Sequence, residues 1–390
     1  MFIGKNLENI RTLCGFSRKE LSDEIKVSEQ AIWQYEVKNM MPEINKIYEL
    51  SKLFNVKTTY FISEQPSLLQ NESVDKHSIA FRAKNHKAST KILNRQYHQA
   101  TYLSNVTNYL FAYVKKPSML ILDLIQEVFN EYHEDISRKV FIKKSAKLSR
   151  KCLMGKNRNN ELLFFIEKSG IVVYEKNIDE DVDAFSFWSD NNIPYIVLGN
   201  NKGVAVRRNF DIAHELGHLV LHRHIQFDTL SQEEYKTIEK EADMFAAEFL
   251  LPEDEFIEDF NQLSKKSNPD HLKLLKEKWF VSIQAIGMRA YYLGLLSDVQ
   301  YRYFWTSINK KGYKKIEPLD KDIKLSRPVK MNSLLDLFFN KKVISPEFLL
   351  DDLKVEPQFL KNIANIDNQL IQKYMDRNDK EKSDMITDIF

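Results

Sequence analysis

The sequence has little cysteine, no excess of either charge and no long hydrophobic run, and each absence excludes a class of protein. Two cysteines among 390 residues cannot build a disulfide framework, which favours a reducing compartment. The net charge of +2 gives no overall basicity, so nucleic-acid binding would depend on a local surface. Lys5, Glu8 and Arg11 interrupt the N-terminal segment, and no run approaches about 18 apolar residues. We therefore expect neither a signal peptide nor a membrane span, and we predict a cytoplasmic protein.

The composition that remains is that of a globular protein with more than one domain. Hydrophobic residues make up 43% of the chain and charged residues 29%. Apolar periodicity predicts a multidomain, mainly α fold with a small β-sheet (α+β). Its first part is all-α, its sheet forms in the middle of the chain, and its C-terminal part is helical. The expected strands are 170–176, 184–188 and 194–199, with a further strand-like run at 301–307, and helices are expected at about 210–223 and 232–251.

The segment 214–218 carries the most specific chemical signal in the chain. It reads His-Glu-Leu-Gly-His, with two imidazoles four positions apart and a carboxylate directly after the first. On an α-helix the two histidines lie on one face, about 6 Å apart along the axis, and can converge on one zinc ion. The motif predicts a zinc-dependent hydrolase in which His214 and His218 bind the metal. Glu215 is the predicted catalytic base.

A catalytic zinc ion needs a third protein ligand and an open fourth position. We expect Glu241 to be that ligand, because it lies among apolar residues of the next helix and a buried carboxylate needs a partner. Glu239, on nearly the opposite face of that helix, and His222, one turn after His218, are the alternatives. We expect His222 to lie next to the metal ligands and not to bind the metal itself. Asp243 is expected to accept a hydrogen bond from a ligating imidazole.

Local signals predict how the helices around the motif begin and pack. Asn209 as N-cap and Asp211 in the first turn predict a helix that begins at 210. Ser231 and Glu234 form a capping box for the next helix. Gly217 allows another element to approach the motif helix closely. No residue is identified as a donor to the oxyanion of a hydrolytic transition state, although Tyr195, His224 and Tyr291 are candidates.

Residues 17–36 carry the pattern of two short helices that pack across a tight turn near Lys26. Ser17 and Ser28 are predicted N-caps, and a third helix is expected over 43–54. The first 60 or so residues resemble the xenobiotic-response-element (XRE) type of helix-turn-helix domain of phage repressors. The resemblance implies that the second helix of the motif enters the major groove of a double-stranded DNA operator, usually as a dimer. The DNA contacts expected by position are Arg18, Lys19, Ser28, Glu29, Gln30, Trp33, Gln34 and Lys38.

DNA binding has an alternative, because residues 1–63 carry nine basic and eight acidic side chains and so have almost no net charge. A helical docking module that never touches DNA would show the same pattern. Trp33 is also unusual on a DNA-reading helix, and packing is an alternative role for its indole.

The motif helix and its successor together resemble a known family. Arg207-Arg208-x-Phe210 and Ala213 precede the motif, and the segments Glu241-Ala242-Asp243-x-Phe245-Ala246 and Leu250-Leu251-Pro252 follow it. This pattern resembles the ImmA/IrrE family of metallopeptidase-like proteins. The family implies a gluzincin-like minimal fold, zinc held by two His and one Glu, and cleavage of repressor-type proteins. The implied domains are 1–63 (helix-turn-helix), 64–77 (linker), 78–320 (zinc peptidase) and 321–390 (helical extension).

Three interpretations of function remain open at this point. The first is a DNA-binding regulatory zinc protease that cleaves a repressor-type or antitoxin-type protein. The second is a transcription regulator whose zinc domain is a sensor or dimerisation scaffold without turnover. The third is the protease toxin of a toxin–antitoxin or antiphage system. An intact Glu215 favours catalysis, because a structural zinc site needs no base and is usually closed by four protein ligands. The 184–188 and 194–199 strands are expected to form a hairpin with an edge that can align a substrate peptide.

Overall fold

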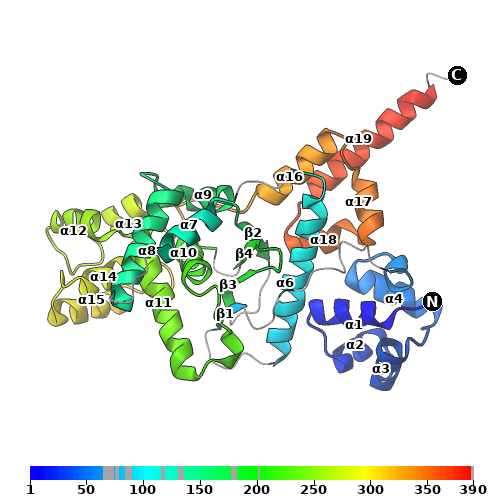
Figure 1. Cartoon of the computed structure of the whole chain (residues 1–390), viewed down its shortest axis with the longest axis horizontal. Helices are drawn as coiled ribbons and strands as arrows, with labels where there is room; N and C mark the ends of the chain where they lie inside the picture. Colours follow the sequence, from blue (N-terminus) through cyan, green and yellow to red (C-terminus); the bar gives the residue numbers. More distant parts are fainter. Residues whose placement is uncertain are drawn as a thin grey trace.

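The computed structural model describes residues 1–64, 74, 79–83, 90–115, 119–130, 136–176, 182–200 and 203–387, and it has the predicted multidomain α+β architecture (Figure 1). A small helical domain at the N-terminus is followed by a sheet with helices on both faces and by a helical C-terminal part. The predicted linker, 64–77, lies outside the described residues except for Glu64 and Val74. None of the helices in the described ranges is long and apolar enough to cross a bilayer.

The N-terminal domain consists of α1 (Gly4–Leu13), α2 (Arg18–Ile25), α3 (Glu29–Lys38), α4 (Ile44–Phe54) and the short η1 (Thr58–Phe61). The predicted caps are confirmed. Ser17 and Glu20 form a reciprocal capping box on α2, and the Ser28 hydroxyl accepts the Ala31 amide at the start of α3. Lys26 makes the turn between the two helices with a left-handed backbone at φ 53°. α2 and α3 therefore form the expected helix-turn-helix.

A buried ion network holds this domain together. The Glu36 side chain is fully buried, and its carboxylate accepts hydrogen bonds from the Arg11 Nε at 2.5 Å and the Arg18 Nε at 2.6 Å. These contacts join α1, α2 and α3. Burial of a carboxylate without a partner destabilises the folded state. The two guanidinium groups therefore allow Glu36 to be buried there.

The middle of the chain builds a sheet and the helices around it. Its elements are β1 (Ala80–Ala83), α6 (Thr90–Phe111), α7 (Leu120–Asn130), α8 (Arg138–Leu153), η3 (Asn159–Glu161), α9 (Leu162–Lys168), β2 (Val172–Lys176), β3 (Val182–Trp188) and β4 (Pro194–Gly199). In the described part of the chain the strand order is β1-β3-β4-β2. β3 and β4 form the predicted antiparallel hairpin, with Ser186 opposite Ile196. The expected free edge on this hairpin is wrong, because β1 pairs with β3 and β2 pairs with β4.

The motif lies on α10 (Ala205–Leu221), which η4 (Phe227–Thr229) and α11 (Gln232–Leu250) follow. α10 begins five residues earlier than predicted, with Val204 as its N-cap. Asn209 is not a cap but lies within the helix and donates its side-chain amide to the Phe280 carbonyl at 3.0 Å. Ser231 and Glu234 form the predicted capping box of α11. The tertiary bond of Asn209 thus replaces the local capping bond that its residue type suggests.

Helices continue beyond α11 as α12 (Glu253–Asn261), α13 (Lys273–Trp279), α14 (Ile283–Tyr292) and α15 (Asp298–Lys310). The strand-like reading of 301–307 is wrong, because these residues lie inside α15. Ser297 and Gln300 cap that helix, and the buried Phe304 and Ile308 are four positions apart on one face. Aromatic and β-branched residues favour strands on average, but capping and burial at helical spacing decide this segment.

The sheet separates two hydrophobic cores. Alternate β3 residues face opposite sides: Ala184 and Trp188 join the core that contains α10 and α11, whereas Phe185 and Phe187 join the core that contains α6. Figure 1 shows α6 as the long helix between the sheet and the N-terminal domain. The motif helix and the N-terminal domain therefore lie on opposite sides of the sheet.

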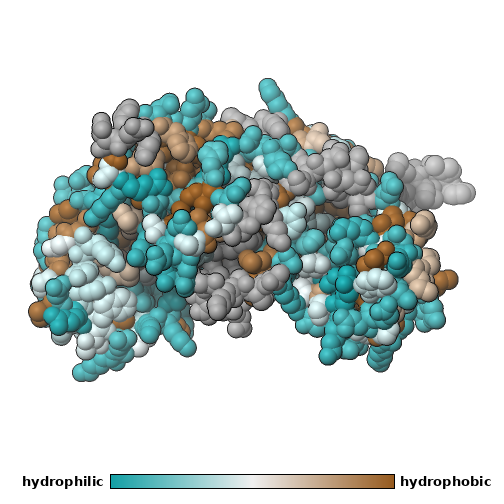
Figure 2. Space-filling view, turned by 60° about the horizontal axis from the view of Figure 1, so that its bottom comes forward, coloured by the Kyte–Doolittle hydropathy of each residue, from teal (hydrophilic) through white to brown (hydrophobic). Residues whose placement is uncertain are grey.

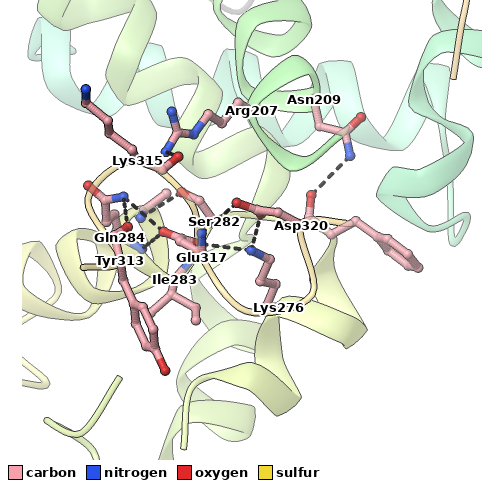
Figure 3. A network of polar contacts seen from close by, with 12 residues as sticks. Arg207, Asn209, Lys276, Ser282, Ile283, Gln284, Tyr313, Lys315, Glu317 and Asp320 are labelled. Atoms are coloured by element: carbon pink, nitrogen blue, oxygen red, sulfur yellow. Dashed lines mark hydrogen bonds and ion pairs between the residues drawn. The ribbon is translucent and has the colours of Figure 1, made fainter. Parts of the chain in front are cut away.

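A buried polar network ties the 312–320 loop to α13 and α14 (Figure 3). Lys276 has no exposed side-chain surface and donates to Glu317 at 2.9 Å and to Asp320 at 2.5 Å. Glu317 also accepts the backbone amides of Ile283 and Gln284, at 2.7 and 3.1 Å, at the start of α14. Arg207, near the start of α10, donates to the Lys315 carbonyl of the same loop at 2.7 Å, so the network reaches the motif helix.

The C-terminal helices are α16 (Lys330–Asn340), α17 (Pro346–Leu353), α18 (Pro357–Ala364) and α19 (Asn368–Thr387). They share the core of the N-terminal domain and of α6. The backbone of Val56 forms an antiparallel bridge with that of Val355, flanked by a hydrogen bond from the Lys57 amide to the Lys354 carbonyl at 2.9 Å. The extension thus contacts both the first domain and the sheet, since α18 packs on β2.

Candidate metal centre and nucleic-acid face

Close packing of α10 against α11 brings the motif to its neighbours. A Cβ on Gly217 would lie 3.2 Å from a ring carbon of Phe245 and 3.3 Å from the Cα of Ala242. The two helices therefore approach as closely as they do because position 217 lacks a side chain, as predicted. His214 and Glu215 are fully buried and His218 is 3% exposed.

Three side chains converge on one point between these helices. The Nε2 atoms of His214 and His218 are 3.0 Å apart, and the Glu239 carboxylate lies 3.5 Å from the first and 3.3 Å from the second. A tetrahedral zinc site with bonds of about 2.0–2.1 Å has ligand–ligand edges of about 3.3 Å. Among the described residues, His214, His218 and Glu239 are the His, Cys, Asp or Glu group that can hold a metal ion. The donor set fits one ion and leaves a coordination position for water or substrate.

The structure does not place Glu241, the expected third ligand, with this group. Its carboxylate lies 3.0 Å from the His222 Nε2 and forms a bidentate ion pair with Arg138, with 2.6 Å between Oε2 and Nη2. Residues two positions apart on an α-helix point in directions about 200° apart. Only one of Glu239 and Glu241 can therefore face His214 and His218. The alternative ligand, Glu239, is the one that does.

Protonation states at this centre also suit a cation. Burial lowers the pKa of His218 to about 3, so its imidazole is neutral at physiological pH. Burial alone would raise the pKa of Glu239, but the two imidazoles that face its carboxylate outweigh burial and hold the pKa well below its usual range. Two neutral imidazoles and one carboxylate are the forms in which these groups bind a metal ion.

The neighbours of the two histidines hold their rings. The Nδ1 of His214 lies 2.8 Å from the Asp243 carboxylate, which is the contact predicted for Asp243. The Nδ1 of His218 lies 3.0 Å from the Nδ1 of His222, so His222 lies beside the ligands and not among them. A carboxylate or another acceptor on the far ring nitrogen is the usual way to orient a metal-binding imidazole.

Glu215 is held from the sheet. The Ser186 hydroxyl, on β3, donates to the Glu215 Oε2 at 2.7 Å, and both side chains are buried. Ser186 and Arg138 are not among the site residues predicted from the sequence. A signal for Ser186 was present, because it is the polar residue between Ala184 and Trp188 on the strand face that the period of two directs toward α10. Arg138 comes from α8, far away in sequence, and no local pattern indicates it.

The candidates for an oxyanion donor lie elsewhere. Tyr195 is fully buried and stacks on Phe187, on the sheet face away from α10. The Tyr291 hydroxyl donates to Asp298 at 2.9 Å. His224 lines an open cleft of about 470 Å³ together with α7 residues such as Phe129.

The helix-turn-helix presents the face expected to meet DNA. Glu29 and Gln30 at the start of α3 are exposed, as are Lys19 and Lys38, and Gln34 is half-buried. Trp33 is half-buried, with the Lys38 ammonium 5.6 Å from its ring centroid. Ser28 is occupied as the N-cap of α3, and the Arg18 guanidinium is engaged by Glu36.

Comparison with known proteins agrees with both halves of this description. Residues 7–61 match the family model described as helix-turn-helix, and residues 166–291 match the peptidase family model described as IrrE N-terminal-like domain. One relative is the HTH-type transcriptional regulator ImmR of Bacillus subtilis. It is 27% identical over 73 residues, which are 19% of this chain and 58% of the relative. The chain thus spans little more than half the length of this curated relative.

Proposed function

We propose that this chain, which combines an XRE-type helix-turn-helix domain with a metallopeptidase domain of the ImmA/IrrE type, is a DNA-binding zinc peptidase that regulates transcription. Its substrate is a repressor-type or antitoxin-type protein, and its site of action is the cytoplasm, where operator DNA is accessible. The observation that carries the proposal is the triangle of His214, His218 and Glu239 beside a buried Glu215.

The chemistry follows from the positions of these side chains. His214, His218 and Glu239 would hold a zinc ion, which would supply a Lewis acid for the scissile carbonyl and for a water molecule. Glu215, directly after His214, accepts the proton of the attacking water and returns it to the leaving amine. Ser186 keeps one carboxylate oxygen of Glu215 fixed during both transfers. Asp243 and His222 hold the two histidines in place from outside the triangle.

A fused DNA-binding domain supports a regulatory role over general proteolysis. Tethering the peptidase to an operator raises its concentration near proteins bound to the same DNA. α3 carries two glutamines whose side chains can each pair bidentately with adenine, and Lys19 and Lys38 are placed for phosphate contacts. These roles are inferred from the positions of the side chains on the motif.

Binding as a homodimer is part of the proposal. Exposed apolar side chains occur on α3, in the segment after it and on α4, and Figure 2 shows hydrophobic residues among hydrophilic ones at the surface. These side chains are between 50% and 72% exposed, and such a patch is characteristic of an association surface. They are Val37, Met40, Met41, Ile44 and Tyr48.

The test compares the wild type with Glu215→Gln. The variant keeps the metal ligands and the helix-turn-helix, so zinc content and DNA affinity should match the wild type. Cleavage of a co-expressed repressor-like protein from the same genomic neighbourhood should be abolished. If Glu215→Gln derepresses the operator as well as the wild type does, the zinc domain acts as a sensor or scaffold and the protease proposal is wrong.

A further inference from the structure

A chain of hydrogen bonds runs outward from one of the two histidines of the metal centre. His218 Nδ1 and His222 Nδ1 are 3.0 Å apart, and His222 Nε2 and the Glu241 Oε2 are 3.0 Å apart. Arg138 then holds Glu241 through its Nε and Nη2, at 3.0 and 2.6 Å. The exposed fraction of the side chain rises along the chain, from 0% at His222 to 13% at Glu241 and 43% at Arg138.

The protons in this series of hydrogen bonds can be assigned by starting from Glu241. Glu241 is held ionised between Arg138 and His222, so it accepts the Nε2–H of His222. A neutral His222 with its proton on Nε2 offers a lone pair on Nδ1, which can only accept. The Nδ1 of His218 must then carry the proton, and its Nε2 lone pair points toward His214 and Glu239. That nitrogen is the one required for metal binding.

We propose that His222 and Glu241 are positioning residues that fix the tautomer of His218 through two successive hydrogen bonds, so that its Nε2 is free to bind the metal ion. This inference rests on the proposed metal site. It also explains why Glu241 resembles a ligand in sequence: the carboxylate serves the site, but through an intervening imidazole.

The two histidines of the triangle are therefore oriented in different ways. His214 meets the Asp243 carboxylate directly, at 2.8 Å, and that carboxylate is 51% exposed. The Nδ1 of His218 is linked to the Glu241 carboxylate through His222, which is buried. Loss of His222 leaves the Nδ1 of His218 in an apolar interior without an acceptor, whereas Asp243 can be replaced in part by water.

The experiment reads the tautomer directly in metal-free protein, by the ¹⁵N shifts of the imidazole nitrogens. The wild type should show His218 protonated on Nδ1. His222→Phe, which removes both hydrogen bonds, should give a mixture of tautomers and weaken zinc binding by about 10–100-fold in competition with a chelator. His222→Gln should stay close to the wild type, because its amide oxygen accepts and its NH₂ donates in the same order.

Two further variants separate this role from general packing. Glu241→Ala should also produce the mixed tautomer, whereas Glu233→Gln, on the exposed first turn of α11, should change nothing. An unchanged His218 tautomer and zinc affinity in His222→Phe and Glu241→Ala would overturn the positioning role. A wild type that binds no zinc contradicts the proposed function instead, so the two failures are distinguishable.

A separate observation concerns the C-terminal helices, which repeat the plan of the N-terminal domain. α2 and α17 each have eight residues and a serine N-cap, Ser17 and Ser345. Each ends in a left-handed lysine, with φ 53° at Lys26 and 56° at Lys354, followed by a valine and the N-cap of the next helix. The sequences around these turns are Asp-Glu-Ile-Lys-Val and Asp-Asp-Leu-Lys-Val.

The correspondence, at a constant offset of 328 positions, extends beyond the turn. Buried residues of α1 and α3 coincide with buried residues of α16 and α18. Left-handed turns of this kind also follow α4 and α13, so the turn alone is not distinctive. The matching pairs outside the turn are Leu7 with Leu335, Ile10 with Phe338, Leu21 with Leu349 and Ile32 with Leu360.

The repeat lacks the basic residues of the first motif that are expected to contact phosphates. Pro346 and Glu347 stand where the first motif has Arg18 and Lys19, and Glu356 stands where it has Ser28. Acidic side chains at these positions repel phosphates. The buried pair Arg11 and Glu36 corresponds to Phe339 and Ala364, both 5% exposed, so an apolar core replaces the ion network.

We infer that residues 330–377 are a second helix-turn-helix-type unit that holds the first one against the sheet and does not read DNA. Its turn pairs with the turn after α4, through the Lys57 amide to the Lys354 carbonyl and the Glu356 amide to the Asn55 carbonyl at 3.0 Å. Phe359 of α18 makes an edge contact with Tyr102 of α6, with ring centroids 5.3 Å apart.

Position-matched variants test the DNA half of this inference. The double variant Gln30→Ala/Gln34→Ala should weaken operator binding at least about tenfold, since one bidentate base contact is worth about 1–3 kcal/mol. The matched double variant Gln358→Ala/Asn362→Ala, at the same positions of α18, should stay within about twofold. A tenfold loss in the α18 variant would overturn the inference.

Hydrogen exchange tests the holding role without DNA. Lys57→Pro removes the amide that bonds Lys354, and the φ of −71° at Lys57 accommodates the proline ring. Amide exchange in α4 and α17 should accelerate by about fivefold, the equivalent of one hydrogen bond. Lys57→Gln, which keeps the amide, should leave exchange near wild type. Equal exchange in Lys57→Pro and Lys57→Gln would contradict the holding role.

Discussion

Glu239 and Glu241 lie two positions apart on α11, yet their carboxylates meet different histidines. Glu239 faces the Nε2 atoms of His214 and His218 at 3.5 and 3.3 Å, whereas Glu241 lies 3.0 Å from the Nε2 of His222. In the function we propose, Glu239 binds the metal ion and Glu241 orients a histidine that does. Substitutions at these two positions should therefore fail in different ways.

Glu239→Gln should remove tight zinc binding, because it replaces the only carboxylate of the triangle with a neutral amide. We expect a loss larger than the roughly 10–100-fold typical of residues that merely orient a ligand. Chelator competition on the purified protein measures it, and Glu233→Gln on the same helix is the control. Zinc affinity equal to wild type in Glu239→Gln would show that Glu239 is not a ligand.

Ser186→Ala should lower turnover without removing the metal. The hydroxyl donates to the Glu215 carboxylate at 2.7 Å, and a hydrogen bond to a charged group contributes about 1.5–3 kcal/mol. We expect kcat to fall by roughly tenfold or more while zinc content stays constant. Ser145→Ala, which removes another buried hydroxyl that donates to the Phe141 carbonyl, is the control. Equal activity in the two variants would exclude a role for Ser186 in holding the base.

Metal-free protein should lose stability as the pH falls. Burial lowers the pKa of His218 from 6.5 to about 3, so below pH 6.5 the unfolded chain takes up a proton that the folded chain refuses. Stability therefore declines from about pH 6.5 toward pH 3. Burial would raise the pKa of Glu241, but His222 and Arg138 lower it from 4.5 to about 2, which adds a loss below pH 4.5.

Thermal unfolding of chelator-treated protein across this pH range checks the sign of the effect. His218→Gln has no group that titrates at this position, so its melting temperature should depend less on pH between about 6.5 and 5. A wild type whose stability rises on acidification through this window would contradict the assignment of a buried neutral imidazole.

Lys276→Met should strongly destabilise the part of the protein that contains α10, α13 and α14. Lys276 is fully buried between Glu317 and Asp320, and removing one partner of a buried ion pair costs about 3–5 kcal/mol. Lys278→Met is a matched control, because its side chain is 57% exposed and its pair with Asp259 contributes at most about 1 kcal/mol. Urea unfolding of both variants gives the comparison, and similar losses would show that the buried network is not stabilising.

Glu36→Gln should destabilise the N-terminal domain by about 3–5 kcal/mol, because Arg11 then keeps a buried charge without a counter-ion. Arg18 bonds Glu36 and is also one of the expected DNA contacts, and the variant removes its partner while it leaves Arg18 in place. Hydrogen exchange in α1–α3 reports the stability, and Glu8→Gln, which removes a partly exposed carboxylate near Arg18, is the control. Unchanged exchange in Glu36→Gln would contradict the structural role.

Local signals in the sequence determined much of this protein. The capping boxes at Ser17 and Ser231 begin helices as predicted, because a capping side chain and its amide are three residues apart. His214 and His218 lie on one face of their helix because they are four positions apart, close to one helical turn. The local pattern of residues 17–36 likewise predicts the helix-turn-helix that α2 and α3 form.

Only the tertiary structure decided which of the two glutamates lies beside both His214 and His218. Both candidates lie on α11, and the choice depends on how that helix is rotated against α10, which Gly217 and Phe245 set by packing. The same is true of Ser186 and Arg138, which reach the site from β3 and α8, and of Asn209, whose side chain bonds the distant Phe280 carbonyl in place of capping a helix. The period of a helix or strand determines on which of its faces a residue lies. How the elements pack determines which residues of other elements that face contacts.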